Sequence, residues 1–204
     1  MSAGSAPPDS PAGARRVSVA RDWSVRLAND GDVPALRQLI DVSVRGLSRG
    51  FYTAEQIDAA LQHVFGVDTQ LIADGTYYVV EDGRDIAAAG GWSRRRTLFG
   101  GDQMKTVEDP MLDPPTEPAR IRAFYVHPAY ARQGLGRLLF RTCAAAARAA
   151  GFHDLTLVAT LPGEPLYAAL GFRVVERLVV YLPDGIELPG ERMTRALGDE
   201  DARF

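Results

Sequence analysis

Hydrophobic residues follow two different spacings in the first third of the chain. Residues 23–27 alternate between apolar and polar side chains, which predicts a short strand. Turn-forming residues come next, and apolar side chains then recur at helical spacing from Pro34 to Ile40. Thr53 and Gln56 have the spacing of a capping box, in which each side chain accepts a hydrogen bond from the other residue's backbone N–H. We therefore expect a second helix to begin there and to run to about His63.

Strand patterns and turn signals alternate in the middle of the chain. Residues 76–81 and 86–95 are predicted strands, and the turn residues 82–85 between them indicate a hairpin. From Thr97 to Pro118, glycines, prolines and acidic residues interrupt every candidate element. A connection of this length inside a compact domain is usually functional or disordered. Two interpretations stay open for it: a solvated loop, or an acidic lid over a substrate.

The remainder of the chain returns to regular patterns. The predicted strands there are 120–126, 155–159, 173–182 and 187–194, and the predicted helices are 136–150 and a short one between Pro165 and Gly171. The first strand, the long helix and the second strand form a βαβ unit. Such a unit requires two parallel strands that are covered by a helix.

Composition and charge limit the classes of protein that this chain can be. Of its 204 residues, 46% are hydrophobic and 24% are charged, as in ordinary globular domains. The net charge of −3 argues against a protein that coats nucleic acid. No apolar run approaches the length of about 18 residues that spans a bilayer, so we expect neither a nucleic-acid nor a membrane partner. Residues 1–20 are rich in Ser, Ala, Gly and Pro, which predicts a disordered tail. The tail lacks the apolar stretch of a signal peptide, so we expect a cytoplasmic protein. We expect residues 21–204 to form a single domain.

Cysteine and histidine give little support for thiol or metal chemistry. Cys143 is the one cysteine, and it falls on the apolar face of the predicted helix 136–150 with no histidine nearby in sequence. We expect it to be a small core residue. His63, His127 and His153 lie far apart without ligand spacing, so no metal site is expected.

The segment from His127 to Arg137 lies between the strand and the helix of the βαβ unit. Ligands bind at this place in open α/β sheets. Gly134 and Gly136 allow the backbone to approach a ligand, and the start of the helix directs its free N–H groups and the positive end of its dipole outward. Arg132 and Arg137 flank the glycines. The segment therefore indicates a phosphate or pyrophosphate site.

Other interpretations of the two glycines exist. A tight strand-to-helix turn needs glycine for conformation alone. A dinucleotide-binding fingerprint is a rival, although Leu139 stands where its third glycine would be. A P-loop is excluded because the chain contains no Gly-Lys-Ser or Gly-Lys-Thr.

A second motif lies further along the chain. Tyr167 precedes the capping Gly171 by four residues, within Leu166-Tyr167-Ala168-Ala169-Leu170-Gly171-Phe172. On its own, a tyrosine on so short a helix would more often serve packing than catalysis. Together with Arg132-Gln133-Gly134-Leu135-Gly136-Arg137, in this order and spacing, the segment resembles the GNAT superfamily of acyl-CoA-dependent N-acetyltransferases.

The resemblance covers nearly everything except the N-terminal tail. It implies an α/β (α+β) fold: a mixed, largely antiparallel central sheet with a parallel βαβ core and flanking helices. It also implies transfer of an acetyl group from acetyl-CoA to a primary amine, by direct attack in a ternary complex and without a metal. The amine would be a small molecule or a peptide, and members of this type often form homodimers.

The resemblance also implies roles for individual residues. The backbone at Tyr125 and Val126 would pair with the pantetheine arm of acetyl-CoA, and Tyr167 would stand near the thioester sulfur as general acid. A phenol with a pKa of about 10 can protonate a departing thiolate whose parent pKa is about 8.5. The pyrophosphate would be held by the backbone amides of the loop: Arg132, Gln133, Gly134, Leu135, Gly136 and Arg137.

The general base and the acceptor are not identified by these motifs. Candidates for the base are Glu81, Glu108, Asp109, Glu117 or a chain of water molecules, whereas His127 beside Pro128 is better explained as a turn residue. The acidic loop, together with Tyr52, His63 and Asp68, could shape an acceptor pocket suited to a cationic amine. The run Arg94–Arg96 could instead favour an acidic acceptor, although a strand would divide it between two faces.

Two further functions stay open at this stage. A non-catalytic acyl-CoA-binding or sensing module could use the same scaffold. A nicotinamide-dependent enzyme would follow if the glycines served a dinucleotide.

Overall fold

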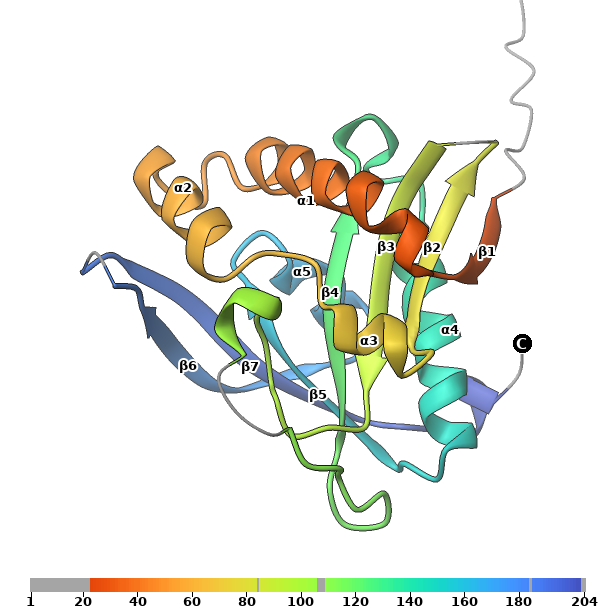
Figure 1. Ribbon diagram of the computed structural model, residues 1–204. Helices are drawn as coiled ribbons and strands as arrows, with labels where there is room; N and C mark the ends of the chain where they lie inside the picture. Colours follow the sequence, from red (N-terminus) through yellow and green to blue (C-terminus); the bar gives the residue numbers. More distant parts are fainter. Residues whose placement is uncertain (1–22, 84, 106–108, 184, 203–204) are drawn as a thin grey trace, which may run out of the picture.

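The computed structural model describes residues 23–83, 85–105, 109–183 and 185–202. The tail expected at residues 1–20 lies outside these ranges. Within them the strands form one seven-stranded sheet in the order β1-β2-β3-β4-β5-β7-β6 (Figure 1). The strands are β1 (Ser24–Leu27), β2 (Tyr77–Asp82), β3 (Asp85–Ser93), β4 (Ala119–Val126), β5 (Asp154–Thr160), β6 (Arg173–Tyr181) and β7 (Glu187–Ala196).

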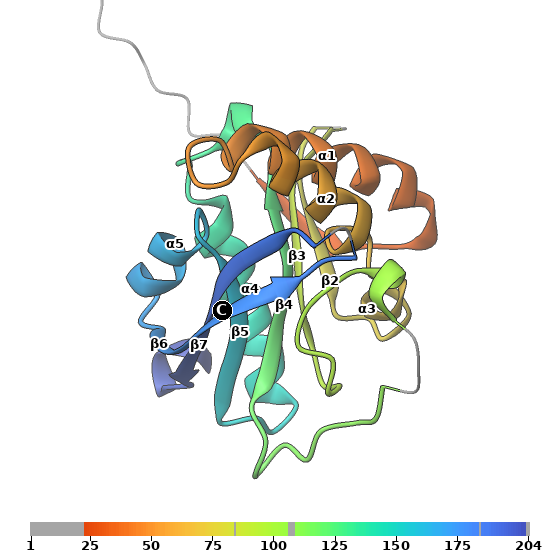
Figure 2. The ribbon, with the colours of Figure 1, turned by 90° about the vertical axis from the view of Figure 1, so that its left-hand side faces the viewer.

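Helices cover both faces of this sheet, as Figure 2 shows. The helices α1, α2 and α3 lie on one face, and α4 and α5 lie on the other. Their bounds are α1 (Val33–Leu47), α2 (Ala54–His63), α3 (Thr69–Ala73), α4 (Leu135–Ala149) and α5 (Glu164–Ala169). The pair β4–β5 is parallel and the other strand pairs are antiparallel. The fold class expected from the sequence is therefore confirmed.

The individual elements agree with the periodicity, with one addition. The capping box of α2 is present in full, with the Gln56 N–H donating to the Thr53 hydroxyl at 3.1 Å and the Thr53 N–H donating to the Gln56 side chain at 2.9 Å. The one-turn helix α3 has no counterpart in the prediction. Its N-terminus is capped by Asp68, whose carboxylate accepts from the Leu71 N–H at 3.4 Å.

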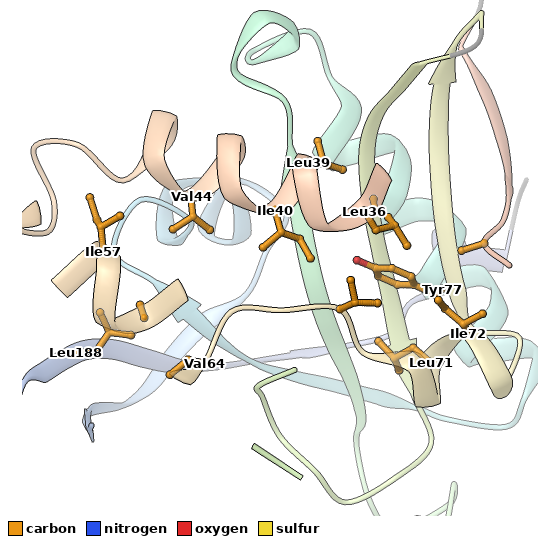
Figure 3. Close-up of a cluster of buried hydrophobic side chains, with 14 of the residues drawn as sticks. Leu36, Leu39, Ile40, Val44, Ile57, Val64, Leu71, Ile72, Tyr77 and Leu188 are labelled. Carbon is orange, nitrogen blue, oxygen red and sulfur yellow. The ribbon is translucent and has the colours of Figure 1, made fainter. Parts of the chain in front are cut away.

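The core on the α1 face is built from amphipathic helices laid on a strongly apolar strand. Leu36, Leu39 and Ile40 of α1 point towards the sheet, where Tyr77 of β2 is fully buried (Figure 3). Burial of such side chains contributes about 1.5–3 kcal/mol each. This packing fixes α1 across the sheet above β3 and β4.

Strand β4 carries a bulge at Ala123 and Phe124. Its register with β3 shifts there, so that the two residues stand opposite Gly90. Ala123 has a φ of 55°, which is unusual for a residue with a side chain. The hydroxyl of Tyr77 donates to the carbonyl of Ala123 at 3.3 Å and helps to hold this conformation. A bulge bends its strand and increases the local twist.

The parallel strands β4 and β5 separate beyond their first residues. Their pairing consists of Ala119 with Leu155 and Arg120 with Thr156. Past these residues the strands run apart, and Figure 1 shows β5 turning towards α5 while β4 continues below α1. The sheet is thus open between its two central strands, next to the loop that leads into α4.

We expect Gly90→Ala to destabilise the protein. A β-carbon at Gly90 would lie 2.4 Å from Cδ1 of Phe124, so the ring must move out of its position over β3. Overpacking of this kind costs about 1–3 kcal/mol, measurable as the free energy of unfolding in urea. Gly31→Ala is the control, because its β-carbon would meet only the side chain of Asn29 within 4 Å. Equal stability of the two variants would contradict the assigned bulge.

Candidate active site

A cavity of about 250 Å³ occupies the space between the separated strands. The second half of β4, from Ile121 to Val126, forms one wall, and Val158–Thr160 of β5 form another. Gly136 in the first turn of α4 and Tyr167 of α5 also line it. Residues that are far apart in the sequence therefore meet in one cavity, although Gly136 is the one residue of the 132–137 motif that lines it.

The loop before α4 presents backbone rather than side chains. Arg132 and Gly134 both have left-handed backbones, with φ values of 63° and 87°. Gly134 is the N-cap of α4 and contributes no side-chain acceptor, so the first N–H groups of the helix lack both an intrahelical partner and a cap. A β-carbon at Gly134 would meet no atom within 4 Å. The N-terminus of α4 is thus open and electropositive.

The side chains of this loop divide into two sets. Arg132, Gln133 and Arg137 are exposed, and the Gln133 side chain donates to the Ala129 carbonyl at 3.2 Å. Leu135 is buried in the core, so only its backbone can reach a ligand. Gly136 is buried because α5 packs close to it, and a β-carbon there would lie 2.7 Å from Cδ2 of Leu166. The second glycine therefore serves helix packing as well as access.

The end of β4 offers backbone groups on the open side. Tyr125 pairs with Ala89 of β3, whereas the Val126 N–H donates to the hydroxyl of Ser43 on α1 at 3.1 Å. Ser43 is buried and lines the cavity. Sequence reasoning did not find it, because a serine in the middle of an amphipathic helix carries no signal of its partner.

Tyr167 lies where the cavity meets the core. Its ring packs against Phe124 and Phe172, at centroid distances of 6.2 and 5.8 Å. Among the described residues its hydroxyl has no hydrogen-bond partner. Burial raises the pKa of Tyr167 above its ordinary value, so the phenol keeps its proton.

Tyr52 also lines the cavity, as the sequence suggested, but its hydroxyl has two partners. It donates to the Pro189 carbonyl at 2.7 Å and accepts from the Leu161 N–H at 2.9 Å. These bonds join the segment after α1 to β7 and to the end of β5. The Tyr52 hydroxyl is therefore a structural link, in contrast to that of Tyr167.

A buried arginine forms the charged part of the cavity wall. Arg122 donates to the Asp68 carboxylate at 2.8 Å and to the carbonyls of Thr97 and Gly100 at 2.7 and 2.6 Å. Lys105 forms an ion pair with the other oxygen of Asp68. Burial lowers the pKa of Arg122, and Asp68 opposes this shift. Local sequence patterns do not indicate this network, since its members are separated by long stretches of chain.

The described lining does not support the hypothesis of an acidic acceptor pocket. Leu98, Phe99 and Gly100 are the residues of the 97–118 connection that line the cavity. Asp109 accepts from the Thr97 N–H at 2.7 Å, and Glu117 accepts from the Asp113 N–H at 2.9 Å. Asp68 faces Arg122, and His63 is not part of the lining.

Two other candidates for a general base, Glu81 and His127, have partners outside the cavity. Glu81 is bound by Arg26 at 2.6 Å, and the Nδ1 atom of His127 accepts from the Ala129 N–H at 3.2 Å, as expected for a turn residue. Glu108 lies outside the described residues. The described lining of the cavity contains no carboxylate and no imidazole.

Cys143 is a core residue, as predicted. It is fully buried on α4, and burial raises the pKa of its thiol, which disfavours the nucleophilic thiolate. Across the described ranges, no group of three or more His, Cys, Asp or Glu side chains is placed to hold a metal ion. None of the helices in those ranges has the length and apolar run needed to cross a bilayer.

Comparison with solved structures finds the same fold in acetyltransferases. A GCN5-related N-acetyltransferase from Rhodopseudomonas palustris is 20% identical, with a TM-score of 0.63 over 85% of this chain and 95% of its own. The PaiA N-acetyltransferase from Thermoplasma acidophilum, in complex with coenzyme A, is 11% identical, with a TM-score of 0.58 over 86% and 99%. A GNAT family acetyltransferase from Brucella melitensis, in complex with acetyl-CoA, is 17% identical, with a TM-score of 0.51 over 88% and 90%.

At these identities the likeness shows the fold. No curated protein matches the chain by sequence. A family model described as an acetyltransferase (GNAT) domain matches residues 73–174, which is half of the chain and includes the α4 loop and Tyr167. The chain therefore belongs to the GNAT acetyltransferase family.

Proposed function

We propose that this protein transfers an acetyl group from acetyl-CoA to a primary amine by direct attack of the amine on the thioester. The observation that carries the proposal is that one cavity is lined both by Gly136, in the first turn of α4, and by the hydroxyl-bearing ring of Tyr167. Two of the similar structures are described as complexes with coenzyme A or acetyl-CoA.

The residues at the N-terminus of α4 fit a pyrophosphate. The left-handed backbone at Arg132 and Gly134 and the free amides up to Arg137 form an electropositive surface, which is open at Gly134. Each dipole–anion contact of this type contributes about 0.3–1 kcal/mol before hydrogen bonds are counted. Arg132 and Arg137 are exposed beside it and can reach phosphate oxygens.

The end of β4 fits the pantetheine arm. An extended amide chain can add to an open strand edge as a further strand. Val126 turns its N–H away from β3, and the Ser43 hydroxyl that now accepts this hydrogen bond can give way to an amide carbonyl. Tyr125 fixes the strand through its pairing with Ala89 on the other edge.

Acetyl-CoA supplies an activated acyl group, so the chain needs no nucleophile of its own. This agrees with a Cys143 thiol that is buried and protonated. Tyr167 keeps its proton at working pH and can donate it to the departing thiolate, because burial raises its pKa. The described lining holds no carboxylate or imidazole to take the proton of the amine. The amine therefore attacks in its neutral form, and the proton that its nitrogen loses on forming the amide passes to water. Water in turn restores the proton that Tyr167 gives to the thiolate.

Release of coenzyme A thiol from acetyl-CoA, measured with a broad panel of amines, tests the proposal. Amine-dependent release with matching acetylated products is the expected result. Tight binding of acetyl-CoA without turnover on any amine would instead favour a binding or sensing module. A rise in melting temperature with a nicotinamide dinucleotide but not with acetyl-CoA would contradict the proposal.

Replacement of Gly134 separates charge from backbone strain at the pyrophosphate site. Gly134→Asp and Gly134→Asn both place a side chain on a left-handed residue, which Asp and Asn tolerate similarly. Only Asp adds negative charge beside the phosphates, so we expect Gly134→Asp to bind acetyl-CoA about tenfold or more weakly than Gly134→Asn. Calorimetric titration measures the two dissociation constants. Equal affinities would remove the pyrophosphate from this loop.

Replacement of Tyr167 tests the proton donor. Tyr167→Phe should lower kcat by about 100-fold or more while the KM for acetyl-CoA changes little. The free energy of unfolding should stay unchanged, because no described residue bonds the Tyr167 hydroxyl. Burial raises the pKa of Tyr167, so this phenol stays protonated up to a pH of at least about 10. The kcat of the wild type should therefore show no loss from ionisation of Tyr167 below that pH.

Tyr52→Phe is the matched control for this experiment. It removes two hydrogen bonds within the protein, so it should lower the free energy of unfolding by about 1–3 kcal/mol and reduce kcat far less than Tyr167→Phe. A larger loss of kcat in Tyr52→Phe than in Tyr167→Phe would show that Tyr167 is not the donor.

A further inference from the structure

The part of the cavity on the α1–α2 face of the sheet is apolar. Its side chains come from α1, from the connection after α2, from the segment that follows β3 and from the β6–β7 hairpin. We call the following residues the acceptor wall: Val44, Leu47, Val64, Phe99, Val180 and Leu188. Figure 3 shows Val44 on the underside of α1, with Val64 and Leu188 below it.

The charged groups at this part of the cavity are paired with one another. Arg122 is the one ionised side chain among the described residues that line it. Its partner Asp68 is 1% exposed and is held by both Arg122 and Lys105, so its carboxylate is not free for a ligand. The described acidic residues of the 97–118 connection are bound elsewhere, as with Asp109 at the Thr97 N–H.

This inference rests on the proposed function: we propose that the acceptor is an amine with an apolar body and no second charged group. A distal ammonium enclosed by apolar side chains and a guanidinium would lose its hydration without gaining a counter-ion. A distal carboxylate would also lose its hydration, because Asp68 and two carbonyls already bind the Arg122 guanidinium. An alkyl or aryl body instead gains by leaving water for the acceptor wall. The same surroundings favour the neutral form of the attacking amine, because removal from water disfavours its protonated form. This explains how the reaction proceeds where the described lining offers no base.

Three amines of one chain length test this acceptor class: hexylamine, hexamethylenediamine and aminocaproate. They differ only in a distal methyl group, ammonium or carboxylate. We expect kcat/KM to be about tenfold or more higher for hexylamine than for either other amine, as for a loss of about 1.4 kcal/mol. An equal or higher value for the diamine or for aminocaproate would overturn the acceptor class while leaving acetyl transfer in place. Bound acetyl-CoA without turnover, here and across the broad panel, would overturn the proposed function and this inference with it.

Two positions on α1 provide a matched pair of variants. Leu47 lines the cavity and is 36% exposed, whereas Val42 is 37% exposed on the same helix and does not line it. A glutamate is tolerable at both, since each side chain already reaches water. Leu47→Glu should lower kcat/KM for hexylamine by about tenfold or more. The ratio of kcat/KM for hexylamine to that for the diamine should also fall, whereas the KM for acetyl-CoA should stay unchanged. Val42→Glu should match the wild type.

Comparison of the two variants separates an effect in the cavity from a general effect of a new charge on α1. Two results would overturn the assignment of the acceptor wall. One is a ratio of kcat/KM for hexylamine to that for the diamine that falls equally in Val42→Glu. The other is a ratio that stays unchanged in Leu47→Glu. Melting temperatures of both variants confirm that each is folded.

Discussion

The bulge at Ala123 and Phe124 turns the second half of β4 away from β5, and the cavity occupies the space that opens between these strands. The bend depends on two contacts that lie outside β4. Gly90 leaves room for the Phe124 ring, and Tyr77 donates a hydrogen bond to the carbonyl of the left-handed Ala123. A continuous parallel pair would close the sheet and leave no path between the α4 loop and the opposite face.

Positions around the opening are held by polar groups that are themselves buried. The hydrogen bonds of Arg122 to Asp68 and to two carbonyls offset the cost of removing its guanidinium from water. They also connect the segment 97–100 to β4. Tyr52 joins β7 to the end of β5 in the same manner. These links hold the acceptor wall on the α1–α2 face. On the α4 side, in contrast, the loop before the helix presents backbone N–H groups that a ligand can reach. The two ends of the cavity thus differ in chemistry: one suits phosphate and the other suits an uncharged body.

Local patterns predicted most of the fold, because strand alternation, the Thr53 capping box and the glycines before α4 act within a few residues. They also indicated both motifs that the cavity joins. The bulge, the Ser43–Val126 bond and the Arg122–Asp68 pair could not be predicted, since each depends on segments separated by dozens of positions. The contacts of the acidic loop were unpredictable for the same reason. Asp109 and Glu117 bind backbone and arginine groups nearby, whereas Leu98 and Phe99 line the cavity.

A titration of the isotope-labelled protein with coenzyme A, followed through backbone amide resonances, shows whether the coenzyme binds between β4 and β5. We expect the largest shifts at Gly134, Gly136 and Val126, at the open N-terminus of α4 and the edge of β4 that faces away from β3. The amide of Gly31, in the 3-10 turn that precedes α1, should stay unchanged. Shifts that cluster away from the space between β4 and β5, with none at Gly134, would contradict binding at this site.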